Sequence, residues 1–305
     1  MKYRVTHTTT YRYAQEVGLC QNEARLKPRD FHRQRCLSSA FSISPDPSDF
    51  CERIDFFGNR VAYFAIQRPH CELTVTVVSE VEVANLAAPD VHSNPLSWEE
   101  ARNKLSESPV LTLNKESDAS GHADLLEARQ YKLDSPMITV GTELCEYAKP
   151  SFAAGVPLID AVTDLMRRIH VDFTYDPTFT TIATPLADVM QHRRGVCQDF
   201  AHLAIGCLRS LGLAARYISG YIETLPAPGA ERLVGADASH AWFAVFVPGS
   251  GWLEFDPTNN KVPADQHITL AWGRDYSDVT PLKGIAFGGG RHSLSVSVDV
   301  ARTVG

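Results

Sequence analysis

The sequence predicts an α+β protein in which a β-sandwich domain precedes a mixed core and the last strand returns to the first sheet. Three observations support this prediction. Residues 1–90 are rich in β-branched and aromatic side chains that alternate with polar ones. The middle of the chain carries apolar residues at helical spacing, followed by two strands around a glycine-rich turn. The last residues alternate again, which predicts a closing strand.

The N-terminal region contains three strand patterns. Apolar and polar residues alternate from Lys2 to Tyr13 and again from Cys71 to Val83. Between them, Ile54 to Phe64 predicts a hairpin whose turn is Gly58-Asn59, a pair that tolerates the backbone angles of a tight turn. Each strand needs to bury one face, so we expect these strands to form a β-sandwich domain over residues 1–90.

Residues 91–155 are typical of a helical linker. Ser97-Trp98-Glu99-Glu100 has the form of a capping box, whereas Ser106 to Ser120 is polar and weakly patterned. Helical spacing returns from Met137 to Lys149 and from Pro157 to His170. The apolar face of this last helix holds Val162, Leu165, Met166 and Ile169.

The most informative segment is Arg193 to His202, where a cysteine follows a glycine turn and begins an amphipathic helix. Cys197 lies in the first helical turn, where unpaired N–H groups and the helix dipole favour a thiolate. Arg193 and Arg194 add positive charge beside it. The alternative is that Cys197 is a small apolar residue packed under the helix, which is the common fate of an unpaired cysteine.

A histidine and an aspartate later in the chain favour the nucleophilic interpretation. Ser239 to Val247 is typical of a strand that opens with His240, and Trp252 to Thr258 is typical of a strand that closes on Asp256. A nucleophilic cysteine needs a base to take its proton, and the base needs an acceptor that fixes its tautomer. Cys197, His240 and Asp256 therefore form a candidate catalytic set.

The expected hairpin contains one conflict with that set. If Val247 pairs with Trp252 across a four-residue loop, Asp256 lies opposite Phe243. Because faces alternate along a strand, His240 would then point to the other side of the sheet. A bulge or a longer loop would bring the two side chains together.

Four blocks of the sequence, taken in order, resemble the bacterial transglutaminase-like proteins of the cysteine-protease type. The blocks are Arg194 to His202, Ala215 to Tyr221, Ser239 to Trp242 and Trp252 to Thr258. With looser similarity near both ends, the resemblance spans most of the chain. It implies a papain-like, transglutaminase-like catalytic core with Cys197 as nucleophile, His240 as general base and Asp256 as orienting carboxylate.

The resemblance also implies an oxyanion donor. Animal transglutaminases place an aromatic donor upstream of the cysteine, and the nearest candidate here is Tyr175, a tyrosine where they have tryptophan. The residues themselves suggest another donor, the backbone N–H of Cys197 with a neighbouring group. Papain-like proteases place a glutamine before the cysteine, whereas Gln198 follows it, so we expect Gln198 to be structural.

Composition limits the class of partner and the location. With 305 residues, 44% hydrophobic and 21% charged, the chain can bury two cores. A net charge of −7 argues against a nucleic-acid or anionic-membrane partner. No apolar run approaches the roughly 20 residues of a membrane span, and Met1 to His7 is polar, so we expect no signal peptide and a cytoplasmic protein.

Metal and disulfide signatures are missing from the sequence. The seven cysteines include no C-x-x-C pair, which indicates neither a disulfide framework nor a zinc ribbon. No calcium loop of the D-x-D-x-D-G type occurs. We therefore expect no metal and no cofactor.

The end of the chain predicts a strand that needs a cover. Apolar residues at Leu294, Val296, Val298 and Val300 alternate with polar ones over Ser293 to Val300. Such a strand cannot bury its apolar face alone. We expect residues 156–275 to form the catalytic core and residues 276–305 to pack on the N-terminal domain.

Together these features predict a thiol enzyme that acts on a peptide or protein amide through a cysteine thioester. Hydrolysis is favoured over transamidation because the sequence reveals no groove for an acceptor lysine. The alternatives are a protein-crosslinking transamidase, an N-acyltransferase of the arylamine type, and a non-catalytic binding module. The sequence does not indicate the oligomeric state.

Overall fold

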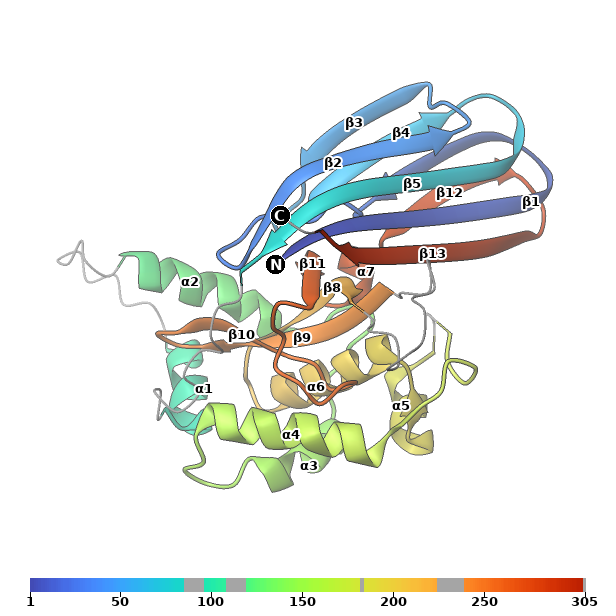
Figure 1. Cartoon of the computed structure of the whole chain (residues 1–305). Coiled ribbons are helices and arrows are strands. Elements are labelled where there is room, and N and C mark those ends of the chain that lie inside the picture. Colours follow the sequence, from blue (N-terminus) through green and yellow to red (C-terminus); the bar gives the residue numbers. More distant parts are fainter. Residues whose placement is uncertain (85–95, 108–118, 182–183, 224–238, 304–305) are drawn as a thin grey trace, which may run out of the picture.

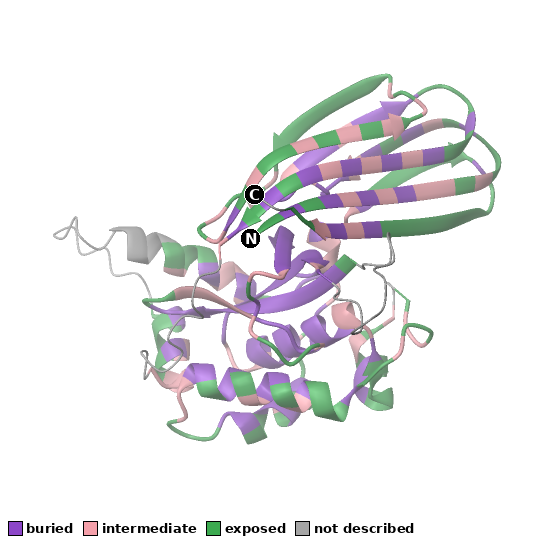
Figure 2. Cartoon of the chain, in the orientation of Figure 1, coloured by how far each residue is buried: buried purple, intermediate pink, exposed green. Residues whose placement is uncertain are grey.

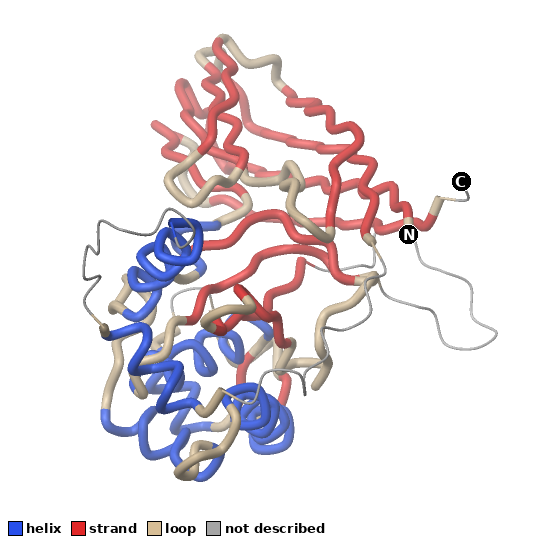
Figure 3. Tube along the Cα trace, turned by 90° about the vertical axis from the view of Figure 1, so that its left-hand side faces the viewer, coloured by secondary structure: helices blue, strands red, loops and turns tan. Residues whose placement is uncertain are grey.

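The computed structural model confirms the α+β class. It describes residues 1–84, 96–107, 119–181, 184–223 and 239–303. A strand-only layer formed by both ends of the chain lies over a mixed layer formed by its middle (Figure 1). In the turned view, most of the helices lie on the side of the mixed layer away from the strand-only layer (Figure 3).

The strand-only layer is one seven-stranded sheet, curved into a half-barrel, rather than two facing sheets. Its strands are β1 (Lys2–Ala24), β2 (Gln34–Ser44), β3 (Asp49–Ile54), β4 (Arg60–Ile66), β5 (His70–Val83), β12 (Leu282–Gly288) and β13 (His292–Arg302), all antiparallel to their partners. The 23-residue strand β1 organises the sheet. Its first part pairs with β5 and β13, and its last part pairs with β4 and β12.

The predicted return of the C-terminus is confirmed. Strand β13 pairs with β1 without a break, from Tyr3 opposite Arg302 to Tyr13 opposite His292. The alternating apolar side chains of β13 face the mixed layer. Val298 and Val300 are buried there, whereas Leu294 and Val296 are about half exposed. The chain end is therefore part of the N-terminal sheet.

The mixed layer is built on a four-stranded antiparallel sheet with the order β10-β9-β8-β11. Its strands are β8 (Ala215–Ile222), β9 (Ser239–Val247), β10 (Gly251–Phe255) and β11 (His267–Gly273). A short parallel pair, β6 (Thr174–Tyr175) with β7 (Arg194–Gly195), lies outside this sheet. Strands β8 and β9 are buried almost throughout (Figure 2).

Helix α6 (Cys197–Ser210) packs against β8 and β9 and is itself covered by other helices. The remaining helices are α1 (Trp98–Ser106), α2 (Ala119–Arg129), α3 (Thr142–Ala148), α4 (Leu158–Asp172), α5 (Leu186–His192) and α7 (Tyr276–Val279), with 3₁₀ turns η2 (Gln130–Lys132) and η3 (Lys149–Ser151). In the described part of the chain, no helix has both the length and the apolar character that crossing a membrane requires.

The predicted helices are found with shifted bounds. The capping box at Ser97 is confirmed, since its hydroxyl accepts from the Glu100 N–H and the Glu100 carboxylate accepts from the Ser97 N–H. The helix expected from Met137 begins at Thr142, after Gly141. The four apolar residues expected on one face of α4 are all buried. Most of the polar segment from Ser106 to Ser120 lies outside the described residues.

Two buried amide side chains of the half-barrel attach it to edge strand β11. The backbone N–H of Thr269 donates to Gln34 Oε1 at 2.8 Å, and Gln34 Nε2 donates to the Thr269 carbonyl at 2.7 Å. Asn59 makes the same pair of bonds with Trp272, at 2.9 and 2.8 Å. Each amide therefore takes the place of a neighbouring strand's peptide group, which protects an edge that would otherwise be open.

Deleting residues 291–305 should destabilise the half-barrel. The deletion exposes the edge of β1 and the apolar surface against which Val298 and Val300 pack. We therefore expect aggregation and loss of cooperative melting. Light scattering and calorimetry measure these effects. The matched control is Leu294→Ser with Val296→Ser, which keeps the strand and changes only half-exposed positions. A truncated protein that stays monomeric with an unchanged melting profile would contradict the prediction.

Candidate active site

The turn before α6 explains the glycine beside the cysteine. A Cβ at Gly195 would lie 2.8 Å from both Cβ and Oδ2 of Asp199, closer than real contacts allow. The Asp199 carboxylate accepts from the Val196 N–H at 2.8 Å and so caps the helix. Burial raises the pKa of Asp199. Cys197, the first residue of α6, is held at a fixed helix terminus and remains partly exposed.

The hairpin loop is one residue shorter than expected, which removes the conflict between His240 and Asp256. Val247 pairs with Gly251 rather than with Trp252, so the loop comprises residues 248–250. Phe255 then lies opposite Phe243. Asp256, the next residue, falls on the alternate face, which is the face of His240. The correction is therefore a shorter loop, not a bulge or a longer one.

Cys197, His240 and Asp256 are brought together. His240 Nε2 lies 2.8 Å from Asp256 Oδ2, and Cys197 and His240 line the same cleft. Burial would lower the pKa of His240, but the interactions with Asp256 and Cys197 outweigh burial and raise that pKa to about 10. The imidazole is thus poised to hold a proton next to the sulfur.

Asp256 is completely buried and is bound by five groups. Its Oδ2 accepts from His240, from His267 at 3.1 Å and from the Asn259 side chain at 2.7 Å. Its Oδ1 accepts from the backbone N–H groups of Thr258 and Asn259. Burial would raise the pKa of Asp256, but these hydrogen bonds hold it well below its usual range.

His267 is a site residue that the sequence reasoning missed. Because Asp256 is ionised and can only accept, His267 Nε2 carries the proton in their 3.1 Å hydrogen bond. Its Nδ1 has no hydrogen-bond partner in the part of the chain that is described. One sequence signal could have indicated it. His267 begins its strand, and His240 likewise lies near the start of its strand.

Trp242 covers both imidazoles. The centre of its ring lies 5.9 Å from the ring centre of His240 and 5.2 Å from that of His267, which it meets edge to face. Its Nε1 donates to Glu254 at 2.9 Å, so the buried indole has its polar atom paired. The indole excludes water from one side of the imidazole–carboxylate pair.

The other sequence candidates occupy distinct positions. Tyr175 is about half exposed, and its strand β6 pairs with β7 just before Cys197. Burial, and then the charge of Cys197, raises the pKa of Tyr175. Arg193 lies over the rings of Tyr147 and Phe173, and Arg194 faces Asp176. The two arginines therefore contact groups other than the thiol.

The site opens into a cleft of about 400 Å³ between the two layers. Its floor includes Cys197, Tyr217 and His240 from the mixed layer. The half-barrel supplies the opposite wall, which comprises His7, Thr9, Tyr11, Leu294, Val296 and Val298. The N-terminal sheet is thus part of the candidate active site.

His240, Asp256 and His267 are also the group of described residues that could hold a metal ion, because their ligand atoms lie within 4.8 Å of one another. In this arrangement both Nε2 atoms are at hydrogen-bond distance from a single carboxylate oxygen, 2.8 and 3.1 Å. Zinc ligands instead lie about 2.0–2.2 Å from a shared ion. The observed distances are those of two imidazole donors, His240 and His267, that share the Asp256 carboxylate as acceptor.

A cysteine at a helix N-terminus, packed on an antiparallel sheet that carries histidine and aspartate, is the arrangement of the papain-like thiol enzymes. Residues 3–82 match the bacterial transglutaminase-like N-terminal region, and residues 147–257 match the transglutaminase-like superfamily. An uncharacterised protein of Mycobacterium tuberculosis is 41% identical over 98% of this chain and 92% of its own length. The chain belongs to the transglutaminase-like superfamily.

Two further comparisons concern a fold and a shorter stretch of sequence. The solved structure of a proposed cysteine protease from Cytophaga hutchinsonii superposes with a TM-score of 0.70 at 20% identity, covering 100% of this chain and 92% of that one. At this identity the likeness shows the fold. A protein-glutamine gamma-glutamyltransferase of Pseudomonas aeruginosa is 30% identical over 44% of this chain and 24% of its own length.

The imidazole–carboxylate pair should make stability depend on pH. The pKa of His240 rises from 6.5 to about 10, so its stabilisation is complete below pH 6.5 and is lost as pH rises toward 10. The pKa of Asp256 falls below 3.8, so its stabilisation is lost as pH falls through the acid range. The melting temperatures of wild type and Asp256→Asn should differ most between pH 3.8 and 6.5. A constant difference up to pH 10 would contradict this.

Removing His267 should destabilise the fold through Asp256. His267→Phe deletes one of the donors to a buried carboxylate, and hydrogen bonds to charged groups contribute about 1.5–3 kcal/mol. We expect a loss of that size in the free energy of unfolding, measured in urea. The exposed His192→Phe serves as the control and should change little. Equal effects of the two substitutions would show that His267 does not support the carboxylate.

Proposed function

We propose that this protein is a cysteine hydrolase that cleaves peptide or protein amides through a thioester on Cys197. The observation that supports this most strongly is that Cys197 and His240 line one cleft and that the His240 imidazole lies 2.8 Å from the Asp256 carboxylate. This cleft is large enough for part of a peptide. The similarity to a proposed cysteine protease agrees with this function at the level of the fold.

In this mechanism Cys197 sulfur attacks the amide carbonyl carbon, and its proton resides on His240. The protonated imidazole then gives that proton to the leaving amine, which leaves the thioester. Water attacks the thioester, assisted by the now neutral imidazole, and frees the acid. Asp256 remains ionised and holds the ring in position throughout.

The developing oxyanion needs donors near the sulfur. The backbone N–H of Cys197 belongs to the first turn of α6, where no intrahelical acceptor exists. Tyr175 is the second candidate, because its strand β6 pairs with β7 just before Cys197. We propose that the two act together, with the peptide N–H as the main donor.

The acceptor decides between hydrolysis and transamidation. Water can reach the thioester because Cys197 and the wall residues Leu294 and Val296 are partly exposed. This exposure favours hydrolysis. The similarity to a protein-glutamine gamma-glutamyltransferase makes transfer to an amine the second candidate. If the thioester is given both water and a primary amine, the product that forms, an acid or an amide, distinguishes hydrolysis from transamidation.

Substitutions of Cys197, His240 and Asp256 should slow amide cleavage to different degrees. Cys197→Ala should abolish turnover of a peptide-amide panel and of casein, with little change in melting temperature, because its side chain is partly exposed. His240→Gln should be nearly as severe, and Asp256→Asn should leave more activity, because the carboxylate transfers no proton. Mass spectrometry should find the acyl group on Cys197. An Asp256→Asn variant with full activity would exclude the proposed role of Asp256.

Cys207 provides an internal control for the same experiment. It is completely buried, and burial raises the pKa of its thiol. Iodoacetamide should therefore label Cys197 and leave Cys207 unmodified in the folded protein. Adding cadaverine to the reaction tests the second candidate: an amide product with the amine, at the expense of free acid, would identify a transamidase.

A further inference from the structure

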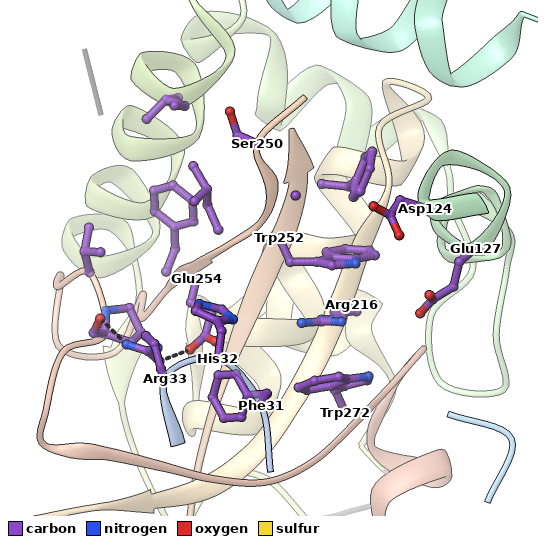
Figure 4. A pocket seen from close by; sticks show the side chains of 17 residues that line it. Phe31, His32, Arg33, Asp124, Glu127, Arg216, Ser250, Trp252, Glu254 and Trp272 are labelled. Carbon is purple, nitrogen blue, oxygen red and sulfur yellow. Dashed lines mark hydrogen bonds and ion pairs between the residues drawn. The ribbon is translucent and has the colours of Figure 1, made fainter. Parts of the chain in front are cut away.

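A second cavity, of about 460 Å³, lies on the same face of the four-stranded sheet as His240 and shares no described lining residue with the active-site cleft. Figure 4 shows its centre, where the Arg216 guanidinium lies between the indoles of Trp252 and Trp272. Phe31, His32 and Arg33 from the half-barrel lie on one side, and Asp124 and Glu127 from α2 lie on the other. The proposed mechanism uses none of these residues.

Arg216 is a buried cation that forms no ion pair within the described residues. It is 5% exposed, and its charged carbon lies 4.3 Å from the Trp252 ring centre and 3.8 Å from that of Trp272. Within the described residues, no hydrogen bond or ion pair reaches its guanidinium, and its Nε is completely enclosed. A buried charge without hydrogen-bond partners is costly, and stacking on indoles repays only part of that cost.

Neighbouring acids balance Arg216 only in part, because the charges of Glu254 and Glu127 favour its charged form but neither carboxylate forms an ion pair with it within the described residues. A second guanidinium, that of Arg29, lies 3.2 Å from the opposite face of the Trp272 ring. The Arg29 guanidinium donates to Asn59 and to a backbone carbonyl, so it has partners. The Glu254 carboxylate, which also lines the cavity, already accepts hydrogen bonds from Arg33 and Trp242. Arg216 thus lacks the hydrogen-bond partner that Arg29 and Glu254 each have.

The far side of the cavity carries the opposite charge. Asp124 and Glu127 are exposed residues of α2 that line the cavity, and neither is paired by a salt bridge within the described residues. A ligand that carries only an anion would be repelled by these carboxylates. A ligand with both an anionic and a cationic group would satisfy Arg216 and the acidic side together. The aromatic walls then accommodate an apolar body.

We propose that this cavity binds an amino-acid-type zwitterion, whose carboxylate pairs with Arg216 and whose ammonium faces Asp124 and Glu127. The side chain lies among Phe31, Trp252 and Trp272. Arg216 offers a planar fork of donors that matches a carboxylate in two parallel hydrogen bonds. The site is separate from the thiol, so it is a binding site in addition to the catalytic one.

Calorimetric titration with three matched probes tests the proposal. L-phenylalanine should bind at millimolar concentration or better, and phenethylamine, which lacks the carboxylate, should not bind. The acid 3-phenylpropionate, which lacks the ammonium, should bind at least about tenfold more weakly than L-phenylalanine. Equal binding of the acid and the amino acid would overturn the zwitterion assignment, and no binding by any probe would overturn the site.

Variants distinguish this cavity from the cleft. Arg216→Met keeps an apolar body between the indoles and should abolish binding of L-phenylalanine, whereas Arg12→Met, on an exposed arginine of β1, should not change it. Glu127→Gln, at an exposed position that cannot prevent folding, should weaken L-phenylalanine but not 3-phenylpropionate. Alkylation of Cys197 should leave binding intact. Loss of binding on alkylation would place the ligand in the cleft and overturn the proposal.

Discussion

The burial of one carboxylate organises this protein's candidate site. Asp256 has no contact with solvent, so its charge must be balanced by donors that the fold delivers from several elements. His240 comes from β9, His267 comes from β11, and Asn259 follows Asp256 itself. Removing one partner from a buried charge is far more damaging than never burying it. The sheet order that sets β9, β10 and β11 in place is therefore also what keeps the imidazole oriented.

The half-barrel contributes to that arrangement from outside the mixed layer. It supplies one wall of the cleft, and its Tyr221–His7 hydrogen bond of 2.9 Å crosses between the layers. Burial lowers the pKa of His7 to about 4, so this histidine is neutral and does not add charge to the cleft. Arg302, at the end of β13, pairs with Glu223 at 2.7 Å. The two ends of the chain thus hold the same interface.

Local patterns predicted much of this molecule because their causes are local. The alternation in β1 and β13, the capping box at Ser97 and the helix that begins at Cys197 each depend on neighbouring residues only. The hairpin register failed as a prediction because a loop one residue shorter moves every side chain to the other face. Sequence patterns alone do not choose between these loops.

Contacts between distant segments could not be predicted from the pattern. His267 reaches Asp256 only because β11 crosses over to pair with β8, and no spacing rule links the two residues. The same holds for the strands expected as a sandwich, which form one curved sheet because β1 is long enough to carry partners along both of its edges. Such outcomes depend on which edges meet in space, not on neighbours in sequence.

The amide side chains of Gln34 and Asn59 have a consequence for how a polypeptide can approach the core. An extended peptide often binds by adding a strand to an open sheet edge, which requires free backbone donors and acceptors there. On β11, the backbone groups of Thr269 and Trp272 that would serve this purpose are already occupied. A peptide therefore cannot extend the four-stranded sheet at these positions of β11, and the cleft between the two layers is the approach to Cys197 that agrees with the proposed function.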